Sequence, residues 1–191
     1  MEEISAVWRA RATESVVLIG FMGCGKTTVA RRLATRLGCD SIDLDAQIEQ
    51  EIGTTIARFF ATRGEAAFRL LETEHLRRAL VQNAVIATGG GIVTRPINRD
   101  LLRDARKNGA ACTIYLRATP QTLALRIRRQ AGVRPLIDGN RVLDWRETRA
   151  RVRFLLSQRS AWYEECADFV IDGDALCADQ IAHIITAYLA P

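Results

Sequence analysis

The amino-acid sequence predicts an α/β fold in which a five-stranded parallel sheet is flanked by helices. Short apolar runs alternate with stretches of helical periodicity along the chain, and this alternation is typical of parallel sheets covered by helices. No internal repeat, low-complexity tract or linker divides the 191 residues. We therefore expect one domain over residues 1–191.

The first half of the chain is expected to open with a strand at residues 16–19, which are all apolar. Helical spacing of apolar residues predicts a helix at 26–37, and Gly38 stands where that helix would stop. The other elements of this half are a strand at 41–44 and helices at 46–51, 55–61 and 65–80.

In the rest of the chain, Thr119 and Pro120 place an N-cap and an N1 proline before a helix that runs to residue 129. Residues 131–140 lack periodicity and hold two glycines and a proline, so we expect a mobile surface loop. Residues 1–14 carry no strong pattern and are expected to be a loosely attached leader. The other elements are strands at 85–88, 112–116 and 169–171 and helices at 144–164 and 178–189.

Composition excludes several classes of protein. Apolar residues make up 48% and charged residues 26% of the chain, which is ordinary globular usage. The apolar runs are too short to span a bilayer and no signal peptide opens the chain, so we expect a cytoplasmic protein with no membrane partner. The five cysteines are scattered and never spaced as CxxC, and the two histidines lack a second ligand. Reduced thiols and no protein-bound transition metal are therefore expected.

The net charge of +5 comes mainly from arginine. A basic surface attracts nucleic acid, but guanidinium groups equally gather small anions. No basic tract with interleaved aromatic residues and no nucleic-acid-binding module is present, so we expect no nucleic-acid partner.

The stretch GFMGCGKTT at residues 20–28 fits the phosphate-binding pattern GxxxxGK[ST] and lies between an expected strand and an expected helix. Glycines let successive backbone N–H groups point inward, and the helix N-terminus adds partial positive charge. Lys26 would reach the β and γ phosphates, and the Thr27 hydroxyl would complete the shell of a Mg²⁺ ion. The residues expected to hold the nucleotide are Gly23, Cys24, Gly25, Lys26, Thr27 and Thr28.

Two carboxylates, Asp43 and Asp45, end the second expected strand, so they would lie on the same side of an extended chain. At the carboxyl edge of the sheet they would face the crevice where ligands bind. Asp43 would hold Mg²⁺ through its water shell, and Asp45 would orient and deprotonate an attacking hydroxyl. The alternative is a solvated turn or a cap for the following helix.

A second group of residues points to an anionic acceptor. Arg69 and Glu72 are three positions apart on one expected helix, so Glu72 could hold the guanidinium while its other donors stay free for a carboxylate. An ordinary surface ion pair has the same spacing. Three glycines at 89–91 follow a strand and allow close backbone approach to a ligand, although a plain tight turn would look alike.

Taken together, these segments resemble shikimate kinase in their order and intervals, over about residues 15–187. The resemblance implies a P-loop kinase fold with a mobile lid loop, and transfer of the ATP γ-phosphoryl group to the 3-hydroxyl of shikimate in aromatic amino-acid synthesis. It also favours a monomer. The matching segments are GFMGCGKTT, DLD at 43–45, GEAAFR at 64–69 with Glu72, GGG at 89–91, VRPLI at 133–137 and QRSAWY at 158–163.

By this resemblance, Asp45 contacts the substrate hydroxyls and serves as the base, while Arg69 and Arg159 grip the substrate carboxylate. Gly90 and Gly91 would bring backbone to the same ligand. ATP and Mg²⁺ are the implied cofactors.

Arg134 resembles the lid arginine that closes over the phosphates, within the lid segment 131–140. Its role would be to stabilise charge on the transferring group and to exclude water. The chain has RPLI where the family usually has RPLL. The arginine that flanks adenine is either Arg126 or Arg128, because the spacing to Arg134 does not decide the register.

Two rival functions share part of this pattern. A kinase for gluconate or for a nucleoside monophosphate would share the P-loop and the lid, but not the DLD, FR, GGG and QR set. A nucleotide-dependent switch would leave Asp45, Arg69 and Arg159 without a shared purpose, and the chain lacks the NKxD signature of guanine binding.

Overall fold

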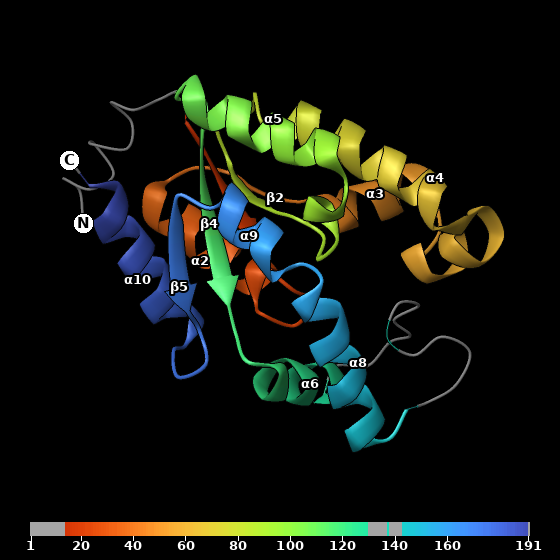
Figure 1. The fold of residues 1–191 in the computed structure, drawn as a ribbon. Coiled ribbons are helices and arrows are strands. Elements are labelled where there is room, and N and C mark those ends of the chain that lie inside the picture. The colour runs from red at the N-terminus through yellow and green to blue at the C-terminus, as the bar shows by residue number, and fades with distance from the viewer. Residues whose placement is uncertain (1–13, 130–136, 138–142, 191) are drawn as a thin grey trace.

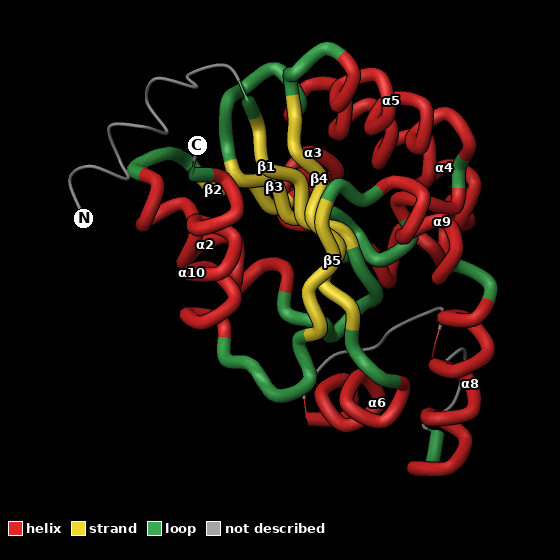
Figure 2. The backbone as a smooth tube through the Cα atoms, turned by 60° about the vertical axis from the view of Figure 1, so that its left-hand side comes forward, coloured by secondary structure: helices red, strands yellow, loops and turns green. Residues whose placement is uncertain are grey.

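The computed structural model describes residues 14–129, 137 and 143–190, and its centre is a five-stranded sheet (Figures 1 and 2). All four strand pairings are parallel, and the strand order is β2-β3-β1-β4-β5. The predicted five-stranded parallel sheet is therefore confirmed. The strands are β1 (Ser15–Ile19), β2 (Ser41–Asp43), β3 (Val85–Ala87), β4 (Ala111–Arg117) and β5 (Phe169–Asp172).

Helices cover both faces of the sheet, with α2 and α10 on one side and α4, α5 and α9 on the other (Figure 2). The described helices are α2 (Lys26–Leu37), α3 (Leu44–Ile52), α4 (Ile56–Ala79), α5 (Pro96–Lys107), α6 (Pro120–Arg129), α8 (Trp145–Ser157), α9 (Ser160–Cys166) and α10 (Ala178–Leu189), with a 3₁₀ turn η1 (Ile92–Thr94). None of them is long and apolar enough to cross a bilayer.

The continuous apolar run of β1 follows from this layering. Val16 and Leu18 pack into the core under α2 and α10, whereas Val17 and Ile19 pack into the core under α4, α5 and α9. Successive residues of a strand face opposite sides, so a central strand that is covered on both sides favours apolar residues on both faces, as at residues 16–19. β1 is thereby fixed in the middle of the sheet, and the loop after it reaches the centre of the carboxyl edge.

Helix α5 was not predicted, because no element was assigned between the glycines at 89–91 and β4. Its signals are present in the sequence: Pro96 occupies the N1 position, and the buried Leu102 and Ala105 lie on one face. Helix α5 packs on the face of the sheet that also holds α4 and α9 (Figure 2).

The long helix expected at residues 144–164 is divided in two. Helix α8 ends at Ser157 and α9 begins at Ser160, so Gln158 and Arg159 form a break. The side chain of Arg159, at this break, is buried against the turn after β3. The helices expected at 55–61 and 65–80 both lie within α4, and the non-helical backbone of Gly64 (φ 80°, ψ 166°) separates two helical segments there, as predicted.

Several expectations fall outside the described residues. They concern the leader, of which residues 1–13 are not described, and the lid segment 131–140 with Arg134, of which only Ile137 is described. Ile137 is buried in the core under α2 and α10.

Candidate active site

The carboxyl edge of the sheet brings together the loop after β1, the end of β2 and the turn after β3. In the loop after β1, Gly20 has φ +145° and Gly25, the residue before α2, has φ +102°. A Cβ atom at Gly20 would lie 2.6 Å from the Leu116 carbonyl oxygen, so only glycine fits there. The loop therefore presents backbone at the N-terminus of α2, as an anion-binding turn requires.

Lys26 begins α2 and folds back over this loop. Its ammonium group donates to the carbonyl oxygens of Gly20 at 2.8 Å and Phe21 at 3.1 Å, and the side chain is buried. The Cys24 thiol lies 3.7 Å from the same nitrogen and is also buried. A cation held inside the loop in this way is placed to meet phosphate oxygens.

Thr27 and Asp43 join the loop to the end of β2. The Thr27 hydroxyl donates to Asp43 Oδ2 at 2.6 Å, and Asp43 Oδ1 accepts from the backbone N–H of Ala46 at 3.2 Å. A hydroxyl and a carboxylate are hard oxygen donors, which suit Mg²⁺ when it is shared with phosphates. Among the described residues, no group of three or more His, Cys, Asp or Glu side chains could hold a metal by itself.

The expectation that Asp43 and Asp45 lie on one extended segment is wrong. The strand ends at Asp43, which caps α3, and Asp45 lies in the first turn of that helix. Capping explains the difference, because the Asp43 carboxylate satisfies a free N–H of the first turn and so starts the helix earlier than expected.

Asp45 lies close to a second carboxylate beside Gly89. A Cβ atom at Gly89 would be 2.7 Å from Asp45 Oδ1 and 2.5 Å from Glu72 Oε1. Burial raises the pKa of Asp45 to about 7, with further contributions from repulsion by Glu72 and Asp43. The Asp45 carboxyl is thus set to change its protonation state near neutral pH, as a general base does.

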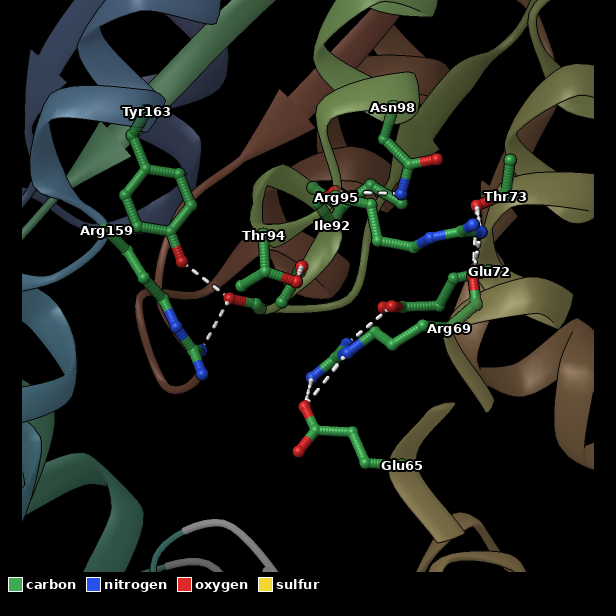
Figure 3. Close-up of polar contacts among 12 residues, drawn as sticks. Glu65, Arg69, Glu72, Thr73, Ile92, Thr94, Arg95, Asn98, Arg159 and Tyr163 are labelled. Atoms are coloured by element: carbon green, nitrogen blue, oxygen red, sulfur yellow. Dashed lines mark hydrogen bonds and ion pairs between the residues drawn. The ribbon is translucent and has the colours of Figure 1, made fainter. Parts of the chain in front are cut away.

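Arg69 carries two carboxylate partners (Figure 3). Its Nη1 donates to Glu72 Oε2 at 2.5 Å, which is the predicted i,i+3 pair. Its Nε and Nη2 both donate to Glu65 Oε1, at 3.1 and 2.7 Å. Glu65, one turn earlier on α4, thus takes two of the five N–H donors of Arg69 and Glu72 takes one, so fewer donors are free than expected, and one N–H on Nη1 and one on Nη2 bond to neither carboxylate. Glu65 is about half exposed, whereas Glu72 is buried.

Arg159 and Tyr163 approach the glycine turn from the opposite side (Figure 3). Arg159 precedes α9, and its Nη1 donates to the Gly90 carbonyl oxygen at 3.2 Å. The Tyr163 hydroxyl donates to the same oxygen at 2.5 Å. Arg159 is only 6% exposed, yet among the described residues no carboxylate lies within ion-pair distance of it.

Residues that the sequence analysis did not single out support this arrangement. Arg95 follows η1, and its Nη1 donates to the Arg69 carbonyl oxygen at 3.2 Å and to Thr73 Oγ1 at 2.6 Å. Arg95 thus ties the turn after β3 to helix α4 (Figure 3). No local pattern marks it, since these contacts join residues more than twenty positions apart.

Arg126 and Arg128, the two candidates for the adenine contact, lie in different surroundings. Arg126 donates to the carbonyl oxygens of Cys24 at 3.3 Å and Gly173 at 3.1 Å, so it joins the phosphate loop to the loop after β5. Arg128 is exposed.

The resulting arrangement has two cationic ends with a carboxylate between them. The charges of both Lys26 and Arg69 lower the pKa of Asp45, in opposition to its burial, so the carboxylate is near both ends. Such a site can hold a polyphosphate at one end and an anionic acceptor at the other, with a base positioned between them.

Comparisons with known proteins agree with this geometry. The family model described as shikimate kinase matches residues 22–190. The shikimate kinase of Enterococcus faecalis is 39% identical, over 92% of this chain and 98% of that protein. The shikimate kinase of Paracidovorax citrulli is 45% identical, over 82% of this chain and 81% of that protein.

Solved structures give the same result. The structure of shikimate kinase from Acinetobacter baumannii in complex with shikimate matches with a TM-score of 0.84 and 32% identity, covering 95% of this chain and 96% of that one. A gluconokinase from Sinorhizobium meliloti, at a TM-score of 0.56 and 16% identity over 94% of this chain and 93% of that one, shares the fold alone.

The raised pKa of Asp45 leads to a prediction about stability. Because its pKa is raised from 3.8 to about 7 in the folded chain, its contribution to stability is fully present below pH 3.8 and is lost as the pH rises to about 7. We expect Asp45→Asn to increase the free energy of unfolding by about 2 to 4 kcal/mol at pH 8 and by less at pH 5. Urea unfolding of the ligand-free protein in EDTA measures both values. The exposed Asp40→Asn is the control, and a less stable Asp45→Asn protein at pH 8 would contradict the prediction.

A second prediction concerns the glycine turn. A Cβ atom at Gly91 would collide with the Arg69 guanidinium, although the φ of −110° at Gly91 suits any residue. We expect Gly91→Ala to lower the free energy of unfolding by about 1 to 3 kcal/mol through overpacking. At Gly173 a Cβ atom would make only ordinary contacts at 3.5 Å, so Gly173→Ala should be close to neutral. Equal stability of the two variants in urea unfolding would show that the turn can shift away from Arg69.

Proposed function

The chain belongs to the shikimate kinase family and phosphorylates shikimate, and we propose that the site described above performs this transfer from ATP to the 3-hydroxyl, with Asp45 as general base. The observation that carries the assignment of the acceptor end is the buried Arg159 guanidinium. It has no carboxylate partner among the described residues, while Arg69 beside the same turn has two. A buried guanidinium that forms no ion pair is costly, even with the Glu72 carboxylate near enough to feel its charge, so this position favours an anionic ligand.

Shikimate supplies such an anion. Its carboxylate fits the planar, forked donors of Arg159 and Arg69, and the backbone of Gly90 and Gly91 lies between these two arginines. Arg69 can offer the N–H donors that neither Glu65 nor Glu72 uses, and release by the half-exposed Glu65 would add two more. The buried Glu72 would keep Arg69 in place during this exchange.

Asp45 would take the proton of the 3-hydroxyl as the hydroxyl oxygen bonds to the γ-phosphorus and the bond to the bridging oxygen of ADP breaks. Its raised pKa of about 7 favours acceptance of a proton near neutral pH. The proximity of both cationic ends supports the same role, since the carboxylate lies where acceptor and phosphate would meet.

At the phosphate end, Lys26 would exchange its carbonyl contacts with Gly20 and Phe21 for phosphate oxygens. The backbone of residues 23–28 would hold the remaining oxygens at the start of α2. The paired Thr27 and Asp43 would hold Mg²⁺. When bound, this ion supplies charge neutralisation on the transferring group.

Two further assignments complete the proposal. Arg126 is favoured over Arg128 as the adenine-flanking arginine, because it already contacts the phosphate loop and the loop after β5. Arg134 lies outside the described residues, so its assignment as the lid arginine rests on the family motif VRPLI alone.

The central test is a coupled assay of ADP release with Mg·ATP and shikimate, gluconate or no acceptor. We expect ADP only with shikimate, and at least about a hundredfold less with Asp45→Asn, because a positioned base is worth 10²- to 10⁴-fold. ATP affinity of the variant, measured by calorimetry, should stay close to that of the unmodified chain. Turnover of gluconate would show that the acceptor is wrong, and near-normal turnover by Asp45→Asn would remove the base role.

The carboxylate assignment predicts a change confined to the acceptor. In Arg159→Lys the positive charge remains but the forked donors are lost, so we expect KM for shikimate to rise about 10- to 100-fold with KM for ATP nearly unchanged. The control is Arg153→Lys, the same change at an exposed position of α8. An increase in KM for ATP with no change for shikimate would place Arg159 at the phosphate end instead.

A further inference from the structure

The peptide group between Gly90 and Gly91 is held by two donors, one from the residue before α9 and one from α9 itself. The Tyr163 hydroxyl and Arg159 Nη1 both bond to the Gly90 carbonyl oxygen, at 2.5 and 3.2 Å (Figure 3). Arg159 immediately precedes α9 and Tyr163 lies one turn later, so this short helix fixes both donors relative to the turn.

The orientation of the carbonyl determines where the next amide points. A trans peptide is planar, so the N–H of Gly91 is directed opposite to the C=O of Gly90. The carbonyl faces Tyr163 and Arg159, and the amide is therefore turned away from these two donors. Among the described residues the Gly91 amide donates to no acceptor, which leaves it available to a ligand.

A Gly–Gly peptide needs such support, because the absence of side chains leaves its backbone free to rotate. Glycine cannot be replaced to stiffen the turn. A Cβ atom at Gly90 would lie 2.8 Å from the Met22 nitrogen of the phosphate loop, and one at Gly91 would meet the Arg69 guanidinium. External hydrogen bonds must therefore hold the peptide in one orientation.

Tyr163 is better suited to this task than Arg159. Its side chain is 0% exposed and stacks on Tyr115, with ring centroids 5.0 Å apart and an interplanar angle of 21°. Burial holds the pKa of Tyr163 well above its ordinary value, so the hydroxyl remains a donor at any working pH. Arg159, in contrast, is expected to direct other donors of its guanidinium at the ligand.

We propose that Tyr163 is a positioning residue for phosphoryl transfer, which orients the Gly90–Gly91 peptide so that the Gly91 N–H donates to the carboxylate of shikimate. This inference rests on the proposed function. It assigns Tyr163 to the acceptor end without contact between Tyr163 and the substrate, and it makes part of the affinity for shikimate depend on a fully buried hydroxyl.

The test compares Tyr163→Phe with Tyr115→Phe. Each variant removes one hydroxyl from the same buried ring stack, but only the first removes a bond to Gly90. For Tyr163→Phe we expect shikimate to bind about five- to thirtyfold more weakly in calorimetry, with KM for shikimate rising in parallel and KM for ATP within about twofold. For Tyr115→Phe we expect wild-type affinity for shikimate.

A Tyr163→Phe protein that binds shikimate as tightly as Tyr115→Phe would overturn the inference, as would equal increases in KM for ATP and shikimate. Failure of the unmodified chain to bind shikimate would instead overturn the proposed function.

A measurement on the unmodified chain keeps the inference testable if Tyr163→Phe does not fold. The chain has 13 glycines, so a glycine-selective ¹⁵N spectrum is simple to assign. We expect the Gly91 amide proton to shift downfield when shikimate is added and to exchange more slowly with solvent. An unchanged Gly91 signal at saturating shikimate would overturn the inference.

Discussion

Both ends of the site depend on a stretch of backbone without side chains after β3. A Cβ atom at Gly89 would strike Asp45 and Glu72, one at Gly90 would strike the backbone of Met22, and one at Gly91 would strike Arg69. The turn is thus packed between the phosphate loop and the acceptor helix α4. Close packing of this kind tolerates little displacement, so it holds the groups that must meet in the reaction at a fixed separation.

Charge is distributed unequally across this turn. Arg69 is neutralised by Glu72 and Glu65, whereas Arg159 has no carboxylate partner among the described residues. The first arrangement keeps a buried cation stable in the free protein, and the second favours an anion that arrives from solution. Asp45 lies near Glu72, and its raised pKa follows mainly from burial and then from this neighbour. In the proposed mechanism, substrate affinity and base strength are therefore coupled through one cluster of charged side chains.

The fold is shared with kinases outside this family, whereas the acceptor end depends on contacts between particular elements of this chain. A gluconokinase has a similar fold at 16% identity, which is expected because the parallel sheet and the phosphate loop serve any nucleotide-dependent transfer. The acceptor end is built from contacts of α4, the glycine turn and α9, and the break before α9 is what places Arg159 and Tyr163 against Gly90. On the proposed assignment, substrate selection therefore rests on elements packed around the shared sheet arrangement rather than on the sheet itself.

The sequence by itself determined the parallel sheet, the phosphate loop, the helix end at Gly38 and the i,i+3 pair on α4, because each depends on residues close together in the chain. Helix α5 could also have been predicted from the sequence, since the proline at its N1 position is a local signal. Only the tertiary structure decided that Asp43 caps α3, that Glu65 occupies Arg69, and that the predicted helix at 144–164 breaks before Arg159. The hydrogen bond from Arg159 to Gly90 joins residues 69 positions apart. The local pattern of apolar residues cannot predict such a contact, because the contact depends on how distant segments pack together.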